Sequence, residues 1–94
     1  MKKFYKSDIK ISNGKIIDIG ALEGDDDVID AEGKYVIPGL VDIHTHGRCG
    51  YDFNTASVDE LRKMKLFYAE KGVTTVVPTL ASDTFENLLG AISR

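Results

Sequence analysis

The chain has 94 residues, of which 43% are hydrophobic and 29% charged, a composition typical of a globular domain and unlike that of a disordered tail. Its 12 basic and 15 acidic residues give a net charge of −3, which argues against a nucleic-acid partner, since such binders carry a basic surface. The single cysteine excludes an intramolecular disulfide, and no run approaches the ~20 apolar residues of a membrane span, so we expect no membrane partner and a cytoplasmic location.

Residues 1–38 are predicted to form a small antiparallel β unit. Apolar and polar residues alternate near 9–11 and again near 16–19, with Asn13-Gly14 between the two runs. Asn-Gly in this position is typical of a hairpin, because a type I′ turn needs positive φ at both of its central residues.

The rest of this unit is predicted to hold an acidic loop and two further strands. Residues 20–27, which include three consecutive aspartates, are expected to form a solvated turn. Short apolar runs predict strands at 28–29 and 35–37. A Pro-Gly break at 38–39 marks the end of the unit.

Residues 39–94 are predicted to alternate strand and helix, beginning with a strand-like run at 40–46. Ser57 and Glu60 form a capping box, which predicts the start of a helix. Gly72 is typical of the position just after a helix end. The helix residues expected to face the core are Leu61, Met64 and Tyr68.

A second strand and a second helix follow. Residues 73–77 are apolar or β-branched, which predicts a buried strand. Asp83 and Glu86 indicate the start of the second helix. Its apolar stripe, expected to pack in the core, comprises Phe85, Leu88, Leu89 and Ile92. Strands joined by a helix pair in parallel, so the sequence predicts an α/β fold with a right-handed β-α-β-α run.

Two histidines mark the candidate chemistry. Asp42, His44 and His46 are spaced by two on the predicted strand, so their side chains should face the same way. The C-terminal end of a parallel strand is where α/β proteins build active sites. Two imidazoles at this position suit a divalent metal, with Zn or Fe expected first and Co or Ni as further candidates. Two unrelated histidines in a core or loop would show the same pattern, and a catalytic metal needs at least three protein ligands.

The residues around the histidines resemble the amidohydrolase superfamily. The segment 28–46 is VIDAEGKYVIPGLVDIHTH. In that superfamily a β-sandwich strand of the form D-A-x-G-x-x-V-x-P-G leads into a first barrel strand that ends in D-x-H-x-H. Two further segments, HGRCGYDFN at 46–54 and GVTTVVPTL at 72–80, are similar to motifs of N-acetylglucosamine-6-phosphate deacetylases. The resemblance spans essentially the whole chain but only the first quarter or so of such an enzyme.

This resemblance implies the N-terminal part of a metal-dependent-hydrolase TIM barrel. Residues 39–94 would supply its first two βα units and residues 1–38 a β-sandwich segment. His44 and His46 would be metal ligands, and the general base and other ligands would lie beyond Arg94. The complete enzyme would convert N-acetylglucosamine 6-phosphate, an amino-sugar phosphate, to glucosamine 6-phosphate and acetate. The 94-residue chain alone would bind metal weakly or not at all and would be inactive.

Two other functions fit the same residues. Another amidohydrolase, dihydroorotase-like or dipeptidase-like, shares the D-x-H-x-H strand. The chain could also be a non-catalytic module for binding or assembly. Whichever function holds, the 94-residue chain is expected to self-associate through open strand edges and uncovered apolar faces, or to form a homo-oligomer.

Residues next to the histidines carry further predictions. Asp42 would either orient a histidine N–H or be a buried polar group at the strand end. Gly47 and Gly50 predict a tight turn and, secondarily, a substrate-lining loop.

Four more polar residues follow the two strands. Cys49 is interpreted as a small loop residue, with soft metal ligand as the alternative. Asp52 and Asn54 are expected to brace the loop through local backbone bonds, with direct substrate contact as the alternative. Thr79 follows the second strand, where it would either line the active site or serve an ordinary turn.

Overall fold

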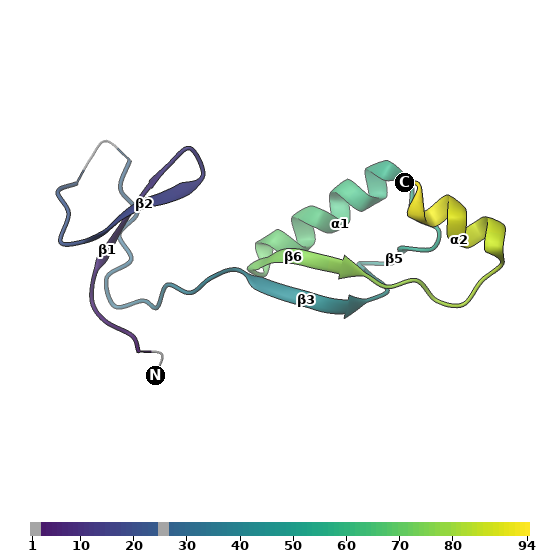
Figure 1. Cartoon of the computed structure of the whole chain (residues 1–94), viewed down its shortest axis with the longest axis horizontal. Helices are drawn as coiled ribbons and strands as arrows, with labels where there is room; N and C mark the ends of the chain where they lie inside the picture. Colours follow the sequence, from purple (N-terminus) through teal and green to yellow (C-terminus); the bar gives the residue numbers. More distant parts are fainter. Residues whose placement is uncertain (1–2, 25–26) are drawn as a thin grey trace. The chain divides into compact units, whose positions relative to one another are not determined.

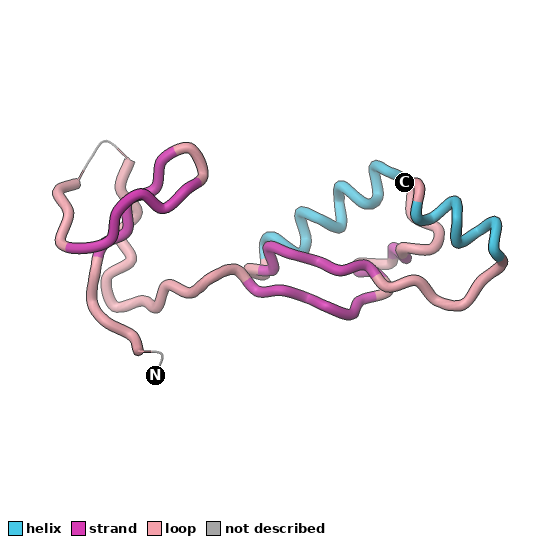
Figure 2. Tube along the Cα trace, in the orientation of Figure 1, coloured by secondary structure: helices cyan, strands magenta, loops and turns pink. Residues whose placement is uncertain are grey.

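The structure, a computed structural model, describes residues 3–24 and 27–94 and shows a mixed α/β protein (Figures 1 and 2). Residues 25 and 26, in the predicted acidic loop, lie outside the described residues. The chain divides into two compact units, Met1–Ile37 and Pro38–Arg94. Within the described ranges, no helix is long and apolar enough to cross a bilayer.

The first unit contains the predicted hairpin, formed by β1 (Asp8–Ser12) and β2 (Lys15–Gly20) in antiparallel pairing. Asn13 and Gly14 have φ angles of 50° and 72°, as a type I′ turn requires. The ladder shifts register by one residue, leaving Ile17 as the extra residue of a β-bulge. The hairpin prediction is therefore confirmed.

The further strands predicted at 28–29 and 35–37 are wrong. Neither segment joins a ladder in the described part of the chain, and the Ile29 side chain is 93% exposed. Tyr35 instead packs edge-to-face against Phe4, with ring centres 4.9 Å apart. A strand forms only where a partner accepts its backbone hydrogen bonds, and these short runs find none here. The described part of this unit is thus a hairpin with irregular flanks.

The second unit is built on β3 (Leu40–Thr45) and β6 (Val73–Pro78), which pair in parallel as predicted. The crossover between them is α1 (Val58–Glu70), which runs beside the strand pair in Figure 1. A short antiparallel pair, β4 (Gly47–Arg48) and β5 (Tyr51–Asp52), follows β3. The described residues contain this two-stranded parallel sheet and no closed barrel.

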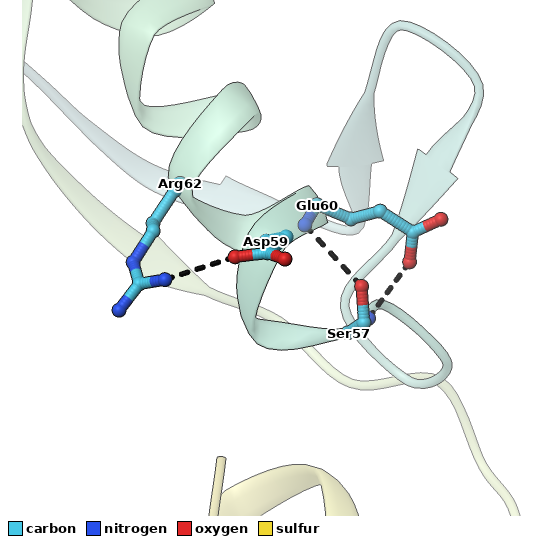
Figure 3. A network of polar contacts seen from close by, with 4 residues as sticks. All are labelled: Ser57, Asp59, Glu60 and Arg62. Carbon is cyan, nitrogen blue, oxygen red and sulfur yellow. Dashed lines mark hydrogen bonds and ion pairs between the residues drawn. The ribbon is translucent and has the colours of Figure 1, made fainter.

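The capping box predicted at the start of α1 is present (Figure 3). The Ser57 hydroxyl accepts from the Glu60 N–H at 3.3 Å, and the Glu60 carboxylate accepts from the Ser57 N–H at 2.7 Å. The Ser57 backbone bond holds the pKa of Glu60 below its ordinary value of 4.5. The ionised Glu60 carboxylate therefore makes its full contribution to the stability of the fold above about pH 4.5. This contribution is lost as the pH falls through the lowered pKa of Glu60. Asp59 and Arg62 add an exposed ion pair at 2.9 Å on the same turn.

The core of this unit lies between α1 and β6. Met64 and Tyr68 are buried on α1, as predicted, and Phe53 and Ala56 join them from the segment before the helix. Partly buried apolar residues complete the cluster: Tyr51, Leu61, Val73, Val76 and Leu80.

Two predicted burial patterns are wrong. Thr74, Thr75 and Val77 of β6 are exposed, although this strand was expected to be buried. Most of the apolar stripe of α2 (Phe85–Ile92) is also exposed, with Phe85 at 77% and Ile92 at 73%, although Leu88 is half-buried. In the described chain, β6 pairs with β3 alone and α1 packs against it, so no further strand or helix layer completes its burial.

α2 begins at Phe85, close to the start signal predicted at Asp83 and Glu86. Thr84, not Asp83, is the N-cap, and its hydroxyl accepts from the Asn87 N–H at 3.3 Å. The Asp83 carboxylate accepts from the Asn87 side-chain amide at 2.8 Å and from the Thr84 N–H at 2.7 Å. These bonds, that of Asn87 foremost, lower the pKa of Asp83. Both residue types cap helices well, so the sequence alone did not separate them.

Replacing Ser57 by Ala should destabilise α1 by about 1 kcal/mol, because the Glu60 N–H loses its acceptor. Urea unfolding followed by helical circular dichroism measures the change. Ser82→Ala, at an exposed serine before α2, is the matched control and should leave the midpoint unchanged. Equal effects of the two substitutions would show that the cap contributes nothing.

We propose that the isolated chain self-associates through the uncovered side and edges of the β3–β6 pair. Ile43 on β3 is 75% exposed, and exposed apolar strands recruit other chains. Ile43→Lys should therefore shift the chain toward monomer in sedimentation velocity, whereas Ile29→Lys, an equal charge change in the first unit, should not. A wild-type chain that stays monomeric at all concentrations would contradict the proposal.

Candidate metal centre

The two histidines lie beside each other at the C-terminal end of β3. Their ring centres are 5.2 Å apart and the ring planes meet at 80°. Both side chains are exposed, so both are accessible to a ligand. The strand predicted through His46 ends at Thr45, and His46 is the first residue after it.

The backbone of β3 is irregular where it carries His44. Asp42 lies opposite Val76 and Thr45 opposite Pro78, so β3 has one residue more than β6 across this stretch. The half-buried Asp42 carboxylate accepts from the His44 backbone N–H at 3.1 Å. Asp42 therefore holds the main chain of a candidate ligand at the irregular step of the strand.

Thr79 ties the end of β6 to the end of β3. Its hydroxyl accepts from the Thr45 N–H at 3.2 Å, and its own N–H donates to the Thr45 carbonyl at 2.8 Å. The half-buried Thr79 thus continues the strand pairing for one residue beyond Pro78.

The loop after His46 is a tight turn, as its glycines predict. Cys49 and Gly50 have φ angles of 55° and 83°, and the exposed Cys49 forms the turn itself. Gly47 has φ of 151°, and a Cβ on it would overlap the Tyr51 carbonyl oxygen. The turn brings the Phe53 N–H to the His46 carbonyl, to which it donates at 2.8 Å. This bond fixes the main chain of His46 on its C-terminal side.

Asp52 and Asn54 brace this loop, as expected from their short polar side chains. The Asp52 carboxylate accepts from the Asn54 N–H at 2.7 Å. The Asn54 amide accepts from the Ala81 N–H at 2.9 Å and donates to the Ala81 carbonyl at 3.1 Å. The two loops that follow β3 and β6 are therefore joined by one side-chain amide.

Sequence analysis missed the contact between Tyr68 and Thr45. The Tyr68 hydroxyl lies 2.6 Å from the Thr45 hydroxyl and 3.4 Å from the Gly47 carbonyl, which it can donate to. The Arg48 guanidinium carbon lies 5.6 Å from the centre of the Tyr68 ring. The sequence held one signal for this contact, which is the tyrosine at a core-facing position of the helix. A buried tyrosine hydroxyl usually has a hydrogen-bond partner.

The histidine pair fits part of a metal site. Two neutral imidazoles suit zinc and related ions, and a metal–nitrogen bond is about 2 Å long, so rings at this separation can reach one ion. Among the described residues, no group of three or more His, Cys, Asp or Glu side chains could hold a metal ion. A catalytic site with three protein ligands therefore needs at least one ligand besides this pair.

Comparison with known proteins decides the family. The family model described as the amidohydrolase family matches residues 27–81, more than half of the chain, and the match includes both histidines. The chain belongs to the amidohydrolase family. The superfamily resemblance drawn from the 28–46 segment is thereby confirmed.

The similar proteins are several times longer than this chain. A D-hydantoinase of Ralstonia pickettii is 38% identical over 95% of the chain and 20% of its own length. An adenine deaminase of Clostridium perfringens is 44% identical over 81% of the chain and 13% of its length. A dihydroorotase of Anoxybacillus flavithermus is 46% identical over 49% of the chain and 11% of its length.

The chain thus spans about a fifth or less of these curated relatives. No solved structure matches it. The names of these relatives support an amidohydrolase, and they support the dihydroorotase-like alternative better than the deacetylase.

Gly47→Ala should unfold the turn after His46, costing about 3 kcal/mol or more, because the new Cβ overlaps the Tyr51 carbonyl as well as straining φ. Gly50→Ala is the matched control: it strains φ in open space and should cost about 1 kcal/mol. Urea unfolding and hydrogen exchange at the Phe53 amide measure both. Equal costs would show that the overlap at Gly47 is relieved by a small shift.

Proposed function

We propose that this chain carries the first metal-binding strand of an enzyme that hydrolyses a C–N bond at a ring carbon of a nitrogen heterocycle. The observation that carries the proposal is the pair of accessible imidazoles, His44 and His46, 5.2 Å apart within the segment that matches the amidohydrolase family. In this proposal both are metal ligands, β3 and β6 are the first two strands of a (β/α)8 barrel, and the remaining ligands and the general base lie outside residues 1–94.

The substrate class follows from the relatives. Hydantoin and dihydroorotate are cyclic amides and adenine is a heterocyclic amidine, so the three enzyme names share hydrolysis at a ring carbon bonded to nitrogen. A family member similar to all three is best assigned to the class of nitrogen heterocycles rather than to one of these compounds.

In the proposed reaction, this chain holds the metal ion and orients the two histidines that bind it. When bound, a divalent ion such as zinc or iron lowers the pKa of a water molecule and polarises the carbonyl or imine carbon that is attacked. His44 and His46 would hold that ion. Asp42 fixes the backbone of His44, Thr79 fixes Thr45, and the Phe53 N–H fixes the His46 carbonyl. A preorganised ligand pair loses less conformational freedom when the metal binds.

Deacetylation of N-acetylglucosamine 6-phosphate is the second candidate. It is favoured by the H-G-x-x-G-x-D and G-V-T-T-x-x-P-T segments. Their residues have structural tasks, however: Gly47 and Gly50 form the turn, Asp52 braces it and Thr79 pairs with Thr45. Any amidohydrolase with this turn would use the same residues, so the motifs support an enzyme acting on a nitrogen heterocycle equally well.

The substrate class is tested on the longest polypeptide that contains residues 1–94, loaded with zinc. We expect hydrolysis of dihydroorotate, hydantoin or adenine, followed by ultraviolet absorbance, and no acetate release from N-acetylglucosamine 6-phosphate. Acetate release, with no reaction of dihydroorotate, hydantoin or adenine, would replace the first candidate by the second. The 94-residue chain should be inactive on all four compounds.

The ligand pair is tested on the 94-residue chain. Zinc should bind with a dissociation constant weaker than about 1 μM, because two imidazoles leave most of the coordination shell to water. In proton NMR the ring signals of both histidines should shift together during the titration, and His44→Ala should abolish binding. Zinc binding that His44→Ala leaves unchanged would overturn the metal assignment.

A further inference from the structure

We propose that Tyr68 is a positioning residue for the histidine pair. Its hydroxyl, held in place by the core, fixes the backbone on both sides of His46 and so sets the separation of the two imidazoles. This inference rests on the proposed function, in which His44 and His46 bind one metal ion.

The position of the phenol oxygen is set by packing. Tyr68 is 4% exposed and lies in the apolar cluster with Met64 and Phe53. A tightly packed ring has little freedom to move, so the Tyr68 hydroxyl is a fixed point for the segment that it contacts. That fixed point lies 2.6 Å from the Thr45 hydroxyl and 3.4 Å from the Gly47 carbonyl.

The segment that carries the histidines needs such a fixed point. The β3–β6 ladder loses its regular register between Asp42 and Thr45, and β3 ends at Thr45. His46 therefore lies between β3 and β4, outside the β3–β6 ladder, where its backbone bond is the one that its carbonyl accepts from the Phe53 N–H.

The Tyr68 hydroxyl contacts the residues on both sides of His46. Thr45 precedes His46 and Gly47 follows it, and the same oxygen atom contacts both. The Thr45 hydroxyl also lies 3.3 Å from the Gly47 carbonyl. Each hydroxyl has one hydrogen, so one hydroxyl donates to the other, and the hydroxyl that accepts this bond donates to the Gly47 carbonyl. Two hydrogen bonds therefore link the residues on both sides of His46. A change in the backbone at His46 that turned its side chain away from His44 would break these hydrogen bonds.

Removing the hydroxyl should therefore separate the rings without emptying the core. Tyr68→Phe keeps the packed ring and deletes the oxygen. In the metal-free chain we expect the nuclear Overhauser effect between the two imidazoles to weaken. We also expect zinc affinity to fall about tenfold, the lower end of the range for residues that orient metal ligands.

Three variants make the test specific. Thr45→Val removes the other hydroxyl and should reproduce the loss, whereas Thr45→Ser keeps an Oγ and should retain wild-type behaviour. Tyr51→Phe, at a partly buried tyrosine that packs against the same cluster, is the matched control and should change neither readout. All measurements are made well below the unfolding midpoint, so that a purely structural role would lower the midpoint and leave both readouts unchanged.

The outcomes separate this inference from the proposed function. Wild-type ring proximity and zinc affinity in Tyr68→Phe and Thr45→Val would overturn the positioning role while leaving the ligand pair intact. Zinc binding that persists in His44→Ala would overturn the ligand pair instead. If zinc binding is too weak to measure, the imidazole contact in the metal-free chain still decides the role of Tyr68.

Discussion

The packing of α1 against β6 is the interaction on which the second unit depends. Two parallel strands cannot be joined by a short turn, so β3 and β6 pair only because a helix carries the chain back across them. Met64 and Tyr68 bury the inner face of that helix, and Phe53 and Ala56 close the cluster from the preceding segment. The capping box at Ser57 adds to this by fixing where the helix starts. With so few buried residues, loss of one large side chain would remove much of the core.

The same helix links the core to the histidines. Tyr68 contributes its ring to the apolar cluster and its hydroxyl to the end of β3, so one side chain serves both packing and the candidate site. The loops that follow the two strands are joined independently, through Thr79 and through the Asn54 amide. The C-terminal ends of both strands are therefore tied together by side-chain hydrogen bonds, which suits a site that must hold two ligands at a set distance.

The exposure of apolar side chains is consistent with the small fraction of its relatives' length that the chain matches. Ile43 on β3 and three of the four stripe residues on α2 are exposed, and the chain matches a fifth or less of the hydantoinase, deaminase and dihydroorotase sequences. In the proposed barrel, later strands and helices would cover these residues and supply the missing metal ligands. The irregular step in β3 would then be a feature of the site, since β-bulges commonly redirect side chains next to active centres.

The sequence by itself determined the features that depend on residues a few positions apart. The Asn13-Gly14 turn, the Ser57–Glu60 capping box, the helix end at Gly72 and the turn after His46 all follow from local backbone requirements. It also identified the family, because the 28–46 segment combines several such requirements in a fixed order. Only the tertiary structure decided which elements are covered. The runs at 28–29 and 35–37, β6 and the α2 stripe have suitable residues, but burial and pairing need partners that the described chain does not supply. The contact between Thr45 and Tyr68 joins residues 23 positions apart, and no local pattern encodes where a helix tyrosine meets a strand end.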